Sequence, residues 1–316
     1  MRRRRGLVTA VLLGLVPVPL AALPASGAVA APASPASATV SVSCRSPAHP
    51  SLARTLDRDI DRVVRGRISA VAIGVDAPGQ RVQCWLDGSA HFDSASVVKV
   101  TILSALLRKT QQQHRNLTRT EAARATEMIT ESDNDAASDL WDDVGRYYLQ
   151  HFLNLAHMTQ TYLGPGPYWG LTRITAYNEV LLLRLLRSRN SVLDTSSRDY
   201  VLDLMARVIP AQRWGVPAGA PTRLTVHVKN GWLPLYPYGW RINSIGVFTG
   251  RGGGYSIVVL TQDNPTMTYG IDTIEAAARV VNRDLNPAAK SRVPSSVPAA
   301  SRDTPDESVP ATAGTP

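Results

Sequence analysis

The segment from Ser94 to Gln112 constrains the fold most, because it predicts a helix that is apolar nearly all round. A helix without a broad polar face is typical of the centre of a domain, where other elements cover it on every side. Such a helix is also a rigid mount for a functional side chain. Its apolar residues are Val97, Val98, Val100, Ile102, Leu103, Leu106 and Leu107.

Ser96 and Lys99 stand three positions apart at the start of this helix, which places them on the same face. A serine hydroxyl is inert at its own pKa, but an amine held neutral by burial can take its proton during attack on a carbonyl. The same spacing also arises by chance about once in a chain of this length. Only four of the 34 basic residues are lysines, and this choice of lysine over arginine favours a chemical role for Lys99.

Length and composition indicate one globular domain with disordered ends, since 44% of the 316 residues are hydrophobic and 19% are charged. Residues 1–30 read as a secretory signal peptide, with four arginines, an apolar run and a small-x-small cleavage site. The arginines also fit a twin-arginine signal, so the export route stays open. We expect an Ala/Pro/Ser linker over 31–45, a catalytic domain over 46–286 and a disordered tail over 287–316.

The expected partners follow from charge and from the spacing of ligand residues. Removal of residues 1–30 takes away four arginines and lowers the formal net charge from +9 to +5. No basic block carries interleaved aromatic residues, so nothing indicates nucleic acid binding. The six histidines are scattered without metal-ligand spacing, and we expect neither metal nor cofactor. No cysteine follows the apolar run closely enough for a lipoprotein anchor, so we expect no stable membrane anchor. We expect the protein to be secreted and to be a monomer.

Cys44 and Cys84 are the only cysteines of the chain. In an exported protein, two cysteines most simply form a disulfide, although two free thiols are the alternative. The bond would tie the N-terminal segment to an early strand.

The hydrophobic pattern predicts two strands, a helical block, three strands and a final helix. Residues 51–67 predict an amphipathic helix, and Thr118 or Thr120 predicts the N-cap of a helix ending at Thr130. The other predicted helices cover 174–187, 198–208 and 271–285, and the predicted strands cover 68–75, 81–86, 224–232, 241–249 and 255–262.

Two further triplets carry polar groups suited to a cleft. Ser132-Asp133-Asn134 interrupts an apolar pattern between helices, where such residues ordinarily cap helix ends. Lys229-Asn230-Gly231 lies on a predicted strand, and its glycine permits close approach of a ligand to the backbone.

Ser96-x-x-Lys99, Ser132-Asp133-Asn134 and Lys229-Asn230-Gly231, in this order on these elements, make the chain resemble the penicillin-recognising serine enzymes. It resembles most closely the class A β-lactamases and their non-lactamase serine-hydrolase relatives. The resemblance covers about residues 46–286 and implies an α/β (α+β) fold, with an antiparallel five-stranded sheet flanked by a helical block.

The resemblance also implies a role for each matching residue. Ser96 would be acylated, with Lys99 as its base or proton relay. Ser132 would pass a proton to the leaving group beside the positive charge of Lys229. The backbone N–H groups of Ser96 and Trp232 would form the oxyanion hole. The implied substrate-binding residues are Asn134, Asn230, Gly231, Trp232 and Arg241.

The chain departs from the family pattern at two places. The strand triplet of the family normally has Thr or Ser where this chain has Asn230, whose amide is longer and differently aimed. Class A β-lactamases resemble one another in a Glu-x-x-Leu-Asn loop that activates the deacylating water, but residues 146–178 contain no Asp or Glu. Glu179, which follows that loop, is expected to be a solvated helix residue.

Three functions fit these residues. The first is a secreted serine hydrolase that forms a Ser96 acyl-enzyme from an amide, lactam or ester, with β-lactam hydrolysis weakened by the missing loop glutamate. The second is a D,D-peptidase or transpeptidase acting on D-alanyl stem peptides of peptidoglycan. The third is a non-catalytic module that binds a cell-wall peptide.

Overall fold

The computed structural model describes residues 41–250 and 254–288. The expected signal peptide, residues 31–40 of the expected linker, nearly all of the expected tail, and the glycine-rich segment 251–253 lie outside these residues. None of the helices in the two described ranges is long and apolar enough to cross a membrane.

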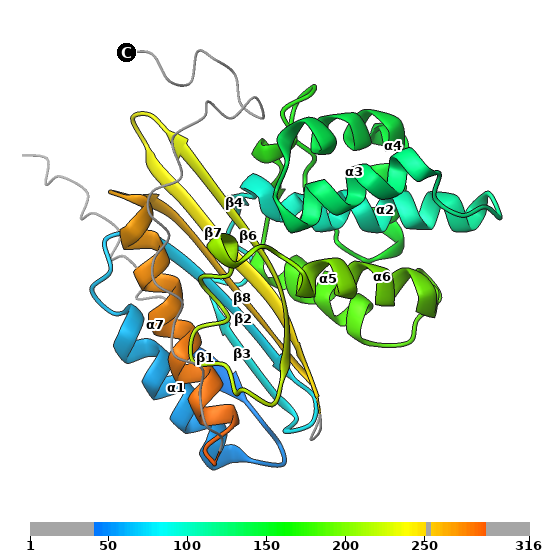
Figure 1. The fold of residues 1–316 in the computed structure, drawn as a ribbon. Coiled ribbons are helices and arrows are strands. Elements are labelled where there is room, and N and C mark those ends of the chain that lie inside the picture. Colours follow the sequence, from blue (N-terminus) through cyan, green and yellow to red (C-terminus); the bar gives the residue numbers. More distant parts are fainter. Residues whose placement is uncertain (1–40, 251–253, 289–316) are drawn as a thin grey trace, which may run out of the picture. The chain divides into compact units, whose positions relative to one another are not determined.

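Over the described ranges the strands form one six-stranded antiparallel sheet in the order β1-β3-β2-β8-β7-β6, with β6 at one edge. Figure 1 shows this sheet between two groups of helices. A separate two-stranded pair joins β4 (Phe92–Asp93), which directly precedes the turn that contains Ser96, to β5 (Arg173–Ile174). The six strands are β1 (Ser43–Arg45), β2 (Ala70–Ala77), β3 (Val82–Leu86), β6 (Thr225–Leu235), β7 (Gly239–Thr249) and β8 (Tyr255–Asn264).

The sheet has six strands over the described residues, so the prediction of five strands is wrong by one. The additional strand lies at the end of the segment that was expected to be a linker, residues 31–45. Ser43–Arg45 forms β1 along β3, with Cys44 directly opposite Cys84, and the two cysteines are disulfide-bonded. Three residues are too few to show an alternating pattern, so β1 could not be recognised from hydrophobicity alone. The predicted disulfide is confirmed, and it is typical of proteins outside the reducing cytoplasm.

Two helices, α1 (Pro50–Val64) and α7 (Met267–Leu285), cover one face of the sheet (Figure 1). The opposite face carries a block of helices, in which α5 packs on β2 and β8 and α6 packs on β6. The block contains α2 (Val98–Gln112), α3 (Arg119–Thr130), α4 (Asn134–Leu155), α5 (Ala176–Arg187) and α6 (Thr195–Ala206).

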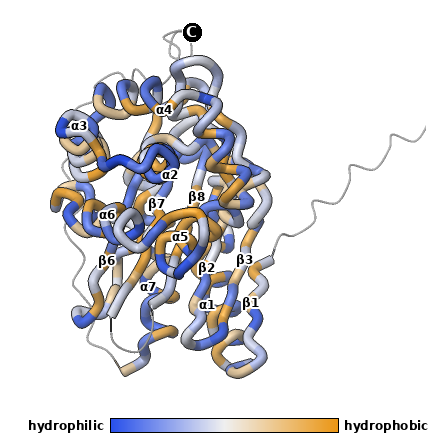
Figure 2. Tube along the Cα trace, turned by 90° about the vertical axis from the view of Figure 1, so that its right-hand side faces the viewer, coloured by the Kyte–Doolittle hydropathy of each residue, from blue (hydrophilic) through white to orange (hydrophobic). Residues whose placement is uncertain are grey.

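The helix that opens with Ser96 is central, as its all-round hydrophobicity predicts. Its first turn is a 3₁₀ helix, η1 (Ala95–Val97), and α2 continues from Val98. Eleven of the fifteen α2 residues are buried. Hydrophobic residues also dominate α5, which lies against the sheet (Figure 2).

A capping box starts the helix that leads to the polar triplet. Thr118 accepts a hydrogen bond from the backbone N–H of Glu121, and the Glu121 carboxylate accepts one from the N–H of Thr118. Of the two predicted N-caps, Thr118 and Thr120, the structure shows Thr118. The cap sets the residue at which α3 begins, and Ser132 follows the C-terminal end of that helix.

Glu179 is buried, contrary to the prediction of a solvated residue. None of its surface is exposed, and neither carboxyl oxygen has a hydrogen-bond partner among the described residues. Burial raises the pKa of Glu179 from its ordinary 4.5 to about 8. The carboxyl is therefore mostly protonated at neutral pH. Its position in the first turn of α5 looked polar in the sequence, but Glu179 lies on the buried face of that turn, with Ala176 and Val180.

We expect the free energy of unfolding to fall as the pH rises from about 4.5 to about 8, because unfolding releases the Glu179 proton within that interval. Glu179→Gln keeps a neutral side chain of the same size at every pH. The variant should match the wild type near pH 5 and exceed its stability near pH 8, as measured by urea unfolding. Glu127→Gln, at an exposed position on α3, is the control and should leave the pH profile unchanged. Equal pH slopes for wild type and Glu179→Gln would contradict the assignment.

The disulfide should contribute strongly to stability, because it closes a loop between positions 40 residues apart. We expect Cys44→Ser/Cys84→Ser to lower the free energy of unfolding by about 2–5 kcal/mol. Urea unfolding of the variant and of the oxidised wild type measures this difference. Thiol titration of the denatured, unreduced wild type should find no free thiol, and two free thiols would refute the bond.

Candidate active site

Ser96 lies in the strained turn that precedes α2. Ala95, the residue before it, has a φ of +46°, a conformation that non-glycine residues adopt only when the surroundings enforce it. The surroundings here are the backbone contacts of Ser94, whose N–H donates to Thr172 O at 2.9 Å. Ser96 keeps 7% of its surface exposed, so its hydroxyl lies at the boundary between core and solvent.

Lys99 is fully buried one turn further along. Its Nζ donates to the carbonyl oxygen of Ser132 at 2.7 Å and to Asn134 Oδ1 at 2.7 Å. A longer contact of 3.3 Å joins Nζ to Ser132 Oγ. Lys99 of the Ser-x-x-Lys pair thus meets the Ser-Asp-Asn triplet in space.

The triplet turns sharply between α3 and α4. Ser132 has a φ of +61°, and Asp133 caps α4 by accepting a hydrogen bond from the N–H of Ala136 at 2.7 Å. Capping therefore explains Asp133, as the sequence suggested, but it does not explain Ser132 or Asn134. The left-handed turn points both of these side chains at Lys99.

Lys229 reaches the same hydroxyl from the sheet. Its Nζ donates to Ser132 Oγ at 2.9 Å and to the carbonyl oxygen of Asn230 at 3.0 Å. Burial, together with the nearby Lys99 amine, holds the pKa of Lys229 well below its ordinary value. Two ammonium groups sharing one buried hydroxyl would repel each other, so the arrangement favours loss of a proton from the pair.

Gly231 brings the edge strand β6 against the nucleophile turn. A Cβ at this position would lie 2.8 Å from Ser94 O and 2.9 Å from the backbone nitrogens of Ser96 and Val97. No side chain fits in that space. The backbone of β6 therefore lies directly against that of the Ser96 turn, and Trp232 is the next residue along this strand.

Asn230 points its amide at the loop before β6. Its Nδ2 donates to Gln212 O at 2.8 Å and to Trp214 O at 2.9 Å, so both N–H groups are in use. A substrate carboxylate would have to break one of these bonds to reach them. The amide instead ties the strand to the 212–214 loop.

Arg241, expected to bind a substrate carboxylate, is held by two carboxylates of the protein itself. Its Nε donates to Asp93 at 3.1 Å and its Nη1 to Asp263 at 3.2 Å. Asp93 also accepts from Arg173 at 3.0 Å. Because Asp93 is three residues before Ser96, the arginine positions the segment that carries the nucleophile.

Trp169 is a site residue that none of the sequence motifs identifies. It is fully buried, and its ring centroid lies 4.6 Å from Lys99 Nζ, within the range of a cation–π contact. Its indole N–H donates to Ser138 Oγ at 3.1 Å. The loop that carries it is fastened to the nucleophile segment, because Ser94 Oγ donates to Gly170 O at 3.3 Å. The density of Gly and Pro around Trp169 was the available signal, since it implies a tightly folded loop.

No group of three or more His, Cys, Asp or Glu side chains within residues 41–250 and 254–288 is arranged to hold a metal ion. The chemistry that the site can perform with its own residues is acyl transfer. It contains a hydroxyl nucleophile, two buried amines, a bridging hydroxyl and a strand backbone beside the nucleophile.

Comparison with known proteins agrees with this geometry. Solved structures with the same fold include a class A β-lactamase from Bacteroides cellulosilyticus, with 18% identity, a TM-score of 0.65, and coverage of 74% of this chain and 98% of that one. The TLA-3 extended-spectrum β-lactamase gives 16% identity, a TM-score of 0.66 and coverage of 73% and 98%. PBP-A gives 19% identity, a TM-score of 0.64 and coverage of 74% and 96%.

No curated protein matches the chain. A sequence model described as "Beta-lactamase enzyme family" matches residues 120–285, which is more than half of the chain. The chain therefore belongs to the β-lactamase enzyme family, and it is a serine hydrolase with the fold of the class A enzymes and PBP-A.

Proposed function

We propose that the protein is an exported acyl-transfer enzyme of the D,D-peptidase type, which forms a Ser96 acyl-enzyme from a D-alanyl peptide. The observation that carries the proposal is the convergence of Lys99 and Lys229 on Ser132 Oγ. Burying two amines beside a hydroxyl costs free energy. A binding module would gain nothing from this arrangement, whereas an enzyme would use the two amines to transfer protons. Export rests on the expected signal peptide and on the disulfide.

Acylation can be written with these residues alone. Ser96 Oγ attacks the peptide carbonyl carbon while its proton passes to a neutral Lys99 Nζ. The oxyanion is held by the backbone N–H groups of Ser96 and Trp232. The C–N bond then breaks, and the leaving nitrogen takes a proton from Ser132 Oγ, which is replenished from Lys99. Because Lys229 donates to Ser132 Oγ, that hydroxyl must direct its own proton elsewhere, and the leaving group is the acceptor.

Deacylation lacks the carboxylate that class A β-lactamases carry in their loop. The equivalent segment of this chain, residues 146–178, contains no acid, and its Trp169 occupies space against Lys99. Water on the acyl carbonyl must therefore rely on Lys99 or on bulk solvent. Loss of a positioned general base commonly costs about 10² to 10⁴ in rate. This deficit favours a D,D-peptidase over a working β-lactamase. PBP-A provides a comparison, since a mutant of it has been solved as an acyl-enzyme complex with penicillin G.

We expect Ser96→Ala and Lys99→Ala each to lower turnover of a D-alanyl peptide by at least about 10³-fold. The double variant should be no slower than either single one, because the two residues act in one step. Initial rates of D-alanine release measure this, and unchanged circular dichroism confirms folding. Lys109→Ala, on the same helix, is the control and should retain the wild-type rate. A Lys99→Ala enzyme keeping more than about a tenth of the rate would remove Lys99 from the role of base.

Penicillin should acylate Ser96 and stay attached. Intact-mass spectrometry should show the mass of one penicillin on the mature protein for minutes or longer, with little hydrolysed product, and Ser96→Ala should show no adduct. Rapid catalytic loss of penicillin without an accumulating adduct would identify a true β-lactamase with another base. Failure of every β-lactam and serine-directed probe to react would favour the binding module.

A further inference from the structure

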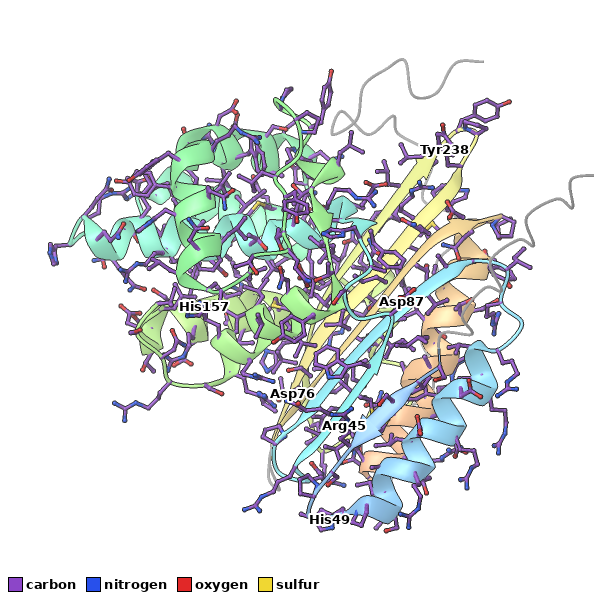
Figure 3. All side chains as sticks on the ribbon, turned by 180° about the vertical axis from the view of Figure 1, so that it is seen from behind. Arg45, His49, Asp76, Asp87, His157 and Tyr238 are labelled. Carbon is purple, nitrogen blue, oxygen red and sulfur yellow. A yellow bond between two sulfur atoms is a disulfide. The ribbon has the colours of Figure 1, made fainter. Side chains whose placement is uncertain are left out.

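Four arginines line a pocket at the end of the sheet where β2 turns into β3. The pocket, here called the arginine pocket, has a volume of about 550 Å³. Figure 3 shows two of its residues, Arg45 and Asp76, close together at the opposite end of the sheet from Tyr238. The arginines come from β1, from the β2–β3 turn and from the last turn of α5, and they are Arg45, Arg81, Arg184 and Arg187.

Asp76 is the one acid among the described residues that line the arginine pocket, and α5 engages both of its oxygens. Arg184 Nη2 donates to Asp76 Oδ1 at 3.1 Å, and Arg184 Nε donates to Oδ2 at 3.3 Å. Arg187 also donates to Oδ2. The Asp76 side chain is only 6% exposed, so it holds the two α5 arginines in place. Four positive charges and one negative charge leave the pocket with a formal excess of three positive charges.

Arg45 and Arg81 have no such partner. Neither side chain forms an ion pair or a hydrogen bond within residues 41–250 and 254–288, and both residues are exposed. Arg81 also has a φ of +50°, a backbone conformation that strains any residue with a side chain more than it strains glycine. The turn therefore carries a guanidinium at a position where a smaller residue would cost less free energy. Such strain is typical of positions that serve binding.

Phosphate groups match these donors and this charge. A guanidinium presents forked N–H groups that pair with two oxygens of one phosphate. A second hollow of about 370 Å³ adjoins the arginine pocket, since Arg45 and Pro47 line both, and Arg54 adds a further arginine there. A chain that carries phosphates at intervals fits this row of arginines better than a single ion does.

The walls of the two hollows indicate what connects the phosphates. No aromatic residue is among the described residues that line them, so nucleobases would find no ring to stack on. Pro47, Pro78 and Val82 supply small apolar surfaces instead. This lining favours a phosphodiester chain built on a small aliphatic alcohol over a nucleic acid.

The arginine pocket is separate from the acyl-transfer site. The register of the sheet leads from Gly231 on β6 across β7 and β8 to Ala72 on β2. Three strand spacings, about 14 Å in all, therefore separate these two positions, and Asp76 lies about 13 Å further along β2. A ligand in the pocket leaves Ser96 accessible.

We propose that the arginine pocket binds a phosphodiester chain of a polyol, and that this chain docks the whole domain at a distance from Ser96. Its phosphates lie against Arg45 and Arg81, with Arg184 as the third cation. Arg187 fixes the wall behind them through Asp76. The site goes beyond acyl transfer and does not depend on it, because none of its residues belongs to the catalytic constellation.

The test measures binding of a short, fluorescently labelled glycerol phosphate oligomer by anisotropy over a series of salt concentrations. The wild type should bind it saturably at low salt. Arg45→Gln/Arg81→Gln should weaken binding at least about tenfold. The slope of log K against log salt concentration should become shallower by about two, which is one for each phosphate contact removed.

A matched control removes two positive charges elsewhere. Arg119→Gln/Arg207→Gln acts at exposed positions on α3 and at the end of α6, and it should keep the wild-type affinity and slope. Unchanged circular dichroism and urea unfolding confirm that both variants are folded. An equal loss of affinity in the control would show attraction to net charge alone and would overturn the site.

Three other outcomes would also contradict the proposal. Absence of oligomer binding by the wild type would refute it. Displacement of the oligomer by inorganic phosphate at the same concentration of phosphate groups would assign the pocket to the free ion. Tighter binding of a single-stranded oligonucleotide through Arg45 and Arg81 would assign it to nucleic acid. Each of these results would leave the Ser96 chemistry intact.

Discussion

The close packing of Gly231 against the Ser96 turn is the contact on which the site depends. It joins the edge of the sheet to the start of the central helix, with a separation that admits no Cβ. Lys229 is carried on the same strand and reaches Ser132 only because β6 lies this close. The sheet therefore determines where the second amine stands, and the helical block determines where the first one stands. A small shift between the two layers would separate the lysines from the hydroxyl that they share.

The sequence predicted the parts of the fold that follow from periodicity. The helix after Ser94, the N-cap at Thr118 and the three late strands all stand where the pattern placed them. The three triplets also converge as the resemblance implied. β1 was missed, because three residues carry no period. Its position beside β3 agrees with the disulfide, because Cys44 lies directly opposite Cys84.

Burial and tertiary partners could not be predicted from residue type. Glu179 looked solvated because acids usually are, yet helix packing buries it and raises its pKa. Arg241 looked available to a substrate, but Asp93 is 148 positions away in the chain, and nothing in the sequence announces that pair. Trp169 touches Lys99 only because a glycine-rich loop folds back onto Ser94. Each of these depends on a contact between distant segments, which local patterns do not encode.

The disulfide between β1 and β3 has a consequence for how the protein behaves at high concentration. The unpaired N–H and C=O groups of an edge strand can pair with a strand of another molecule. Here β1, at one edge, is only three residues long and covalently fastened to its neighbour. β6, at the other edge, is covered at Gly231 by the nucleophile turn. The same contact that assembles the active site thus also shields part of the second edge, so the architecture that positions Ser96 protects the folded chain from aggregation.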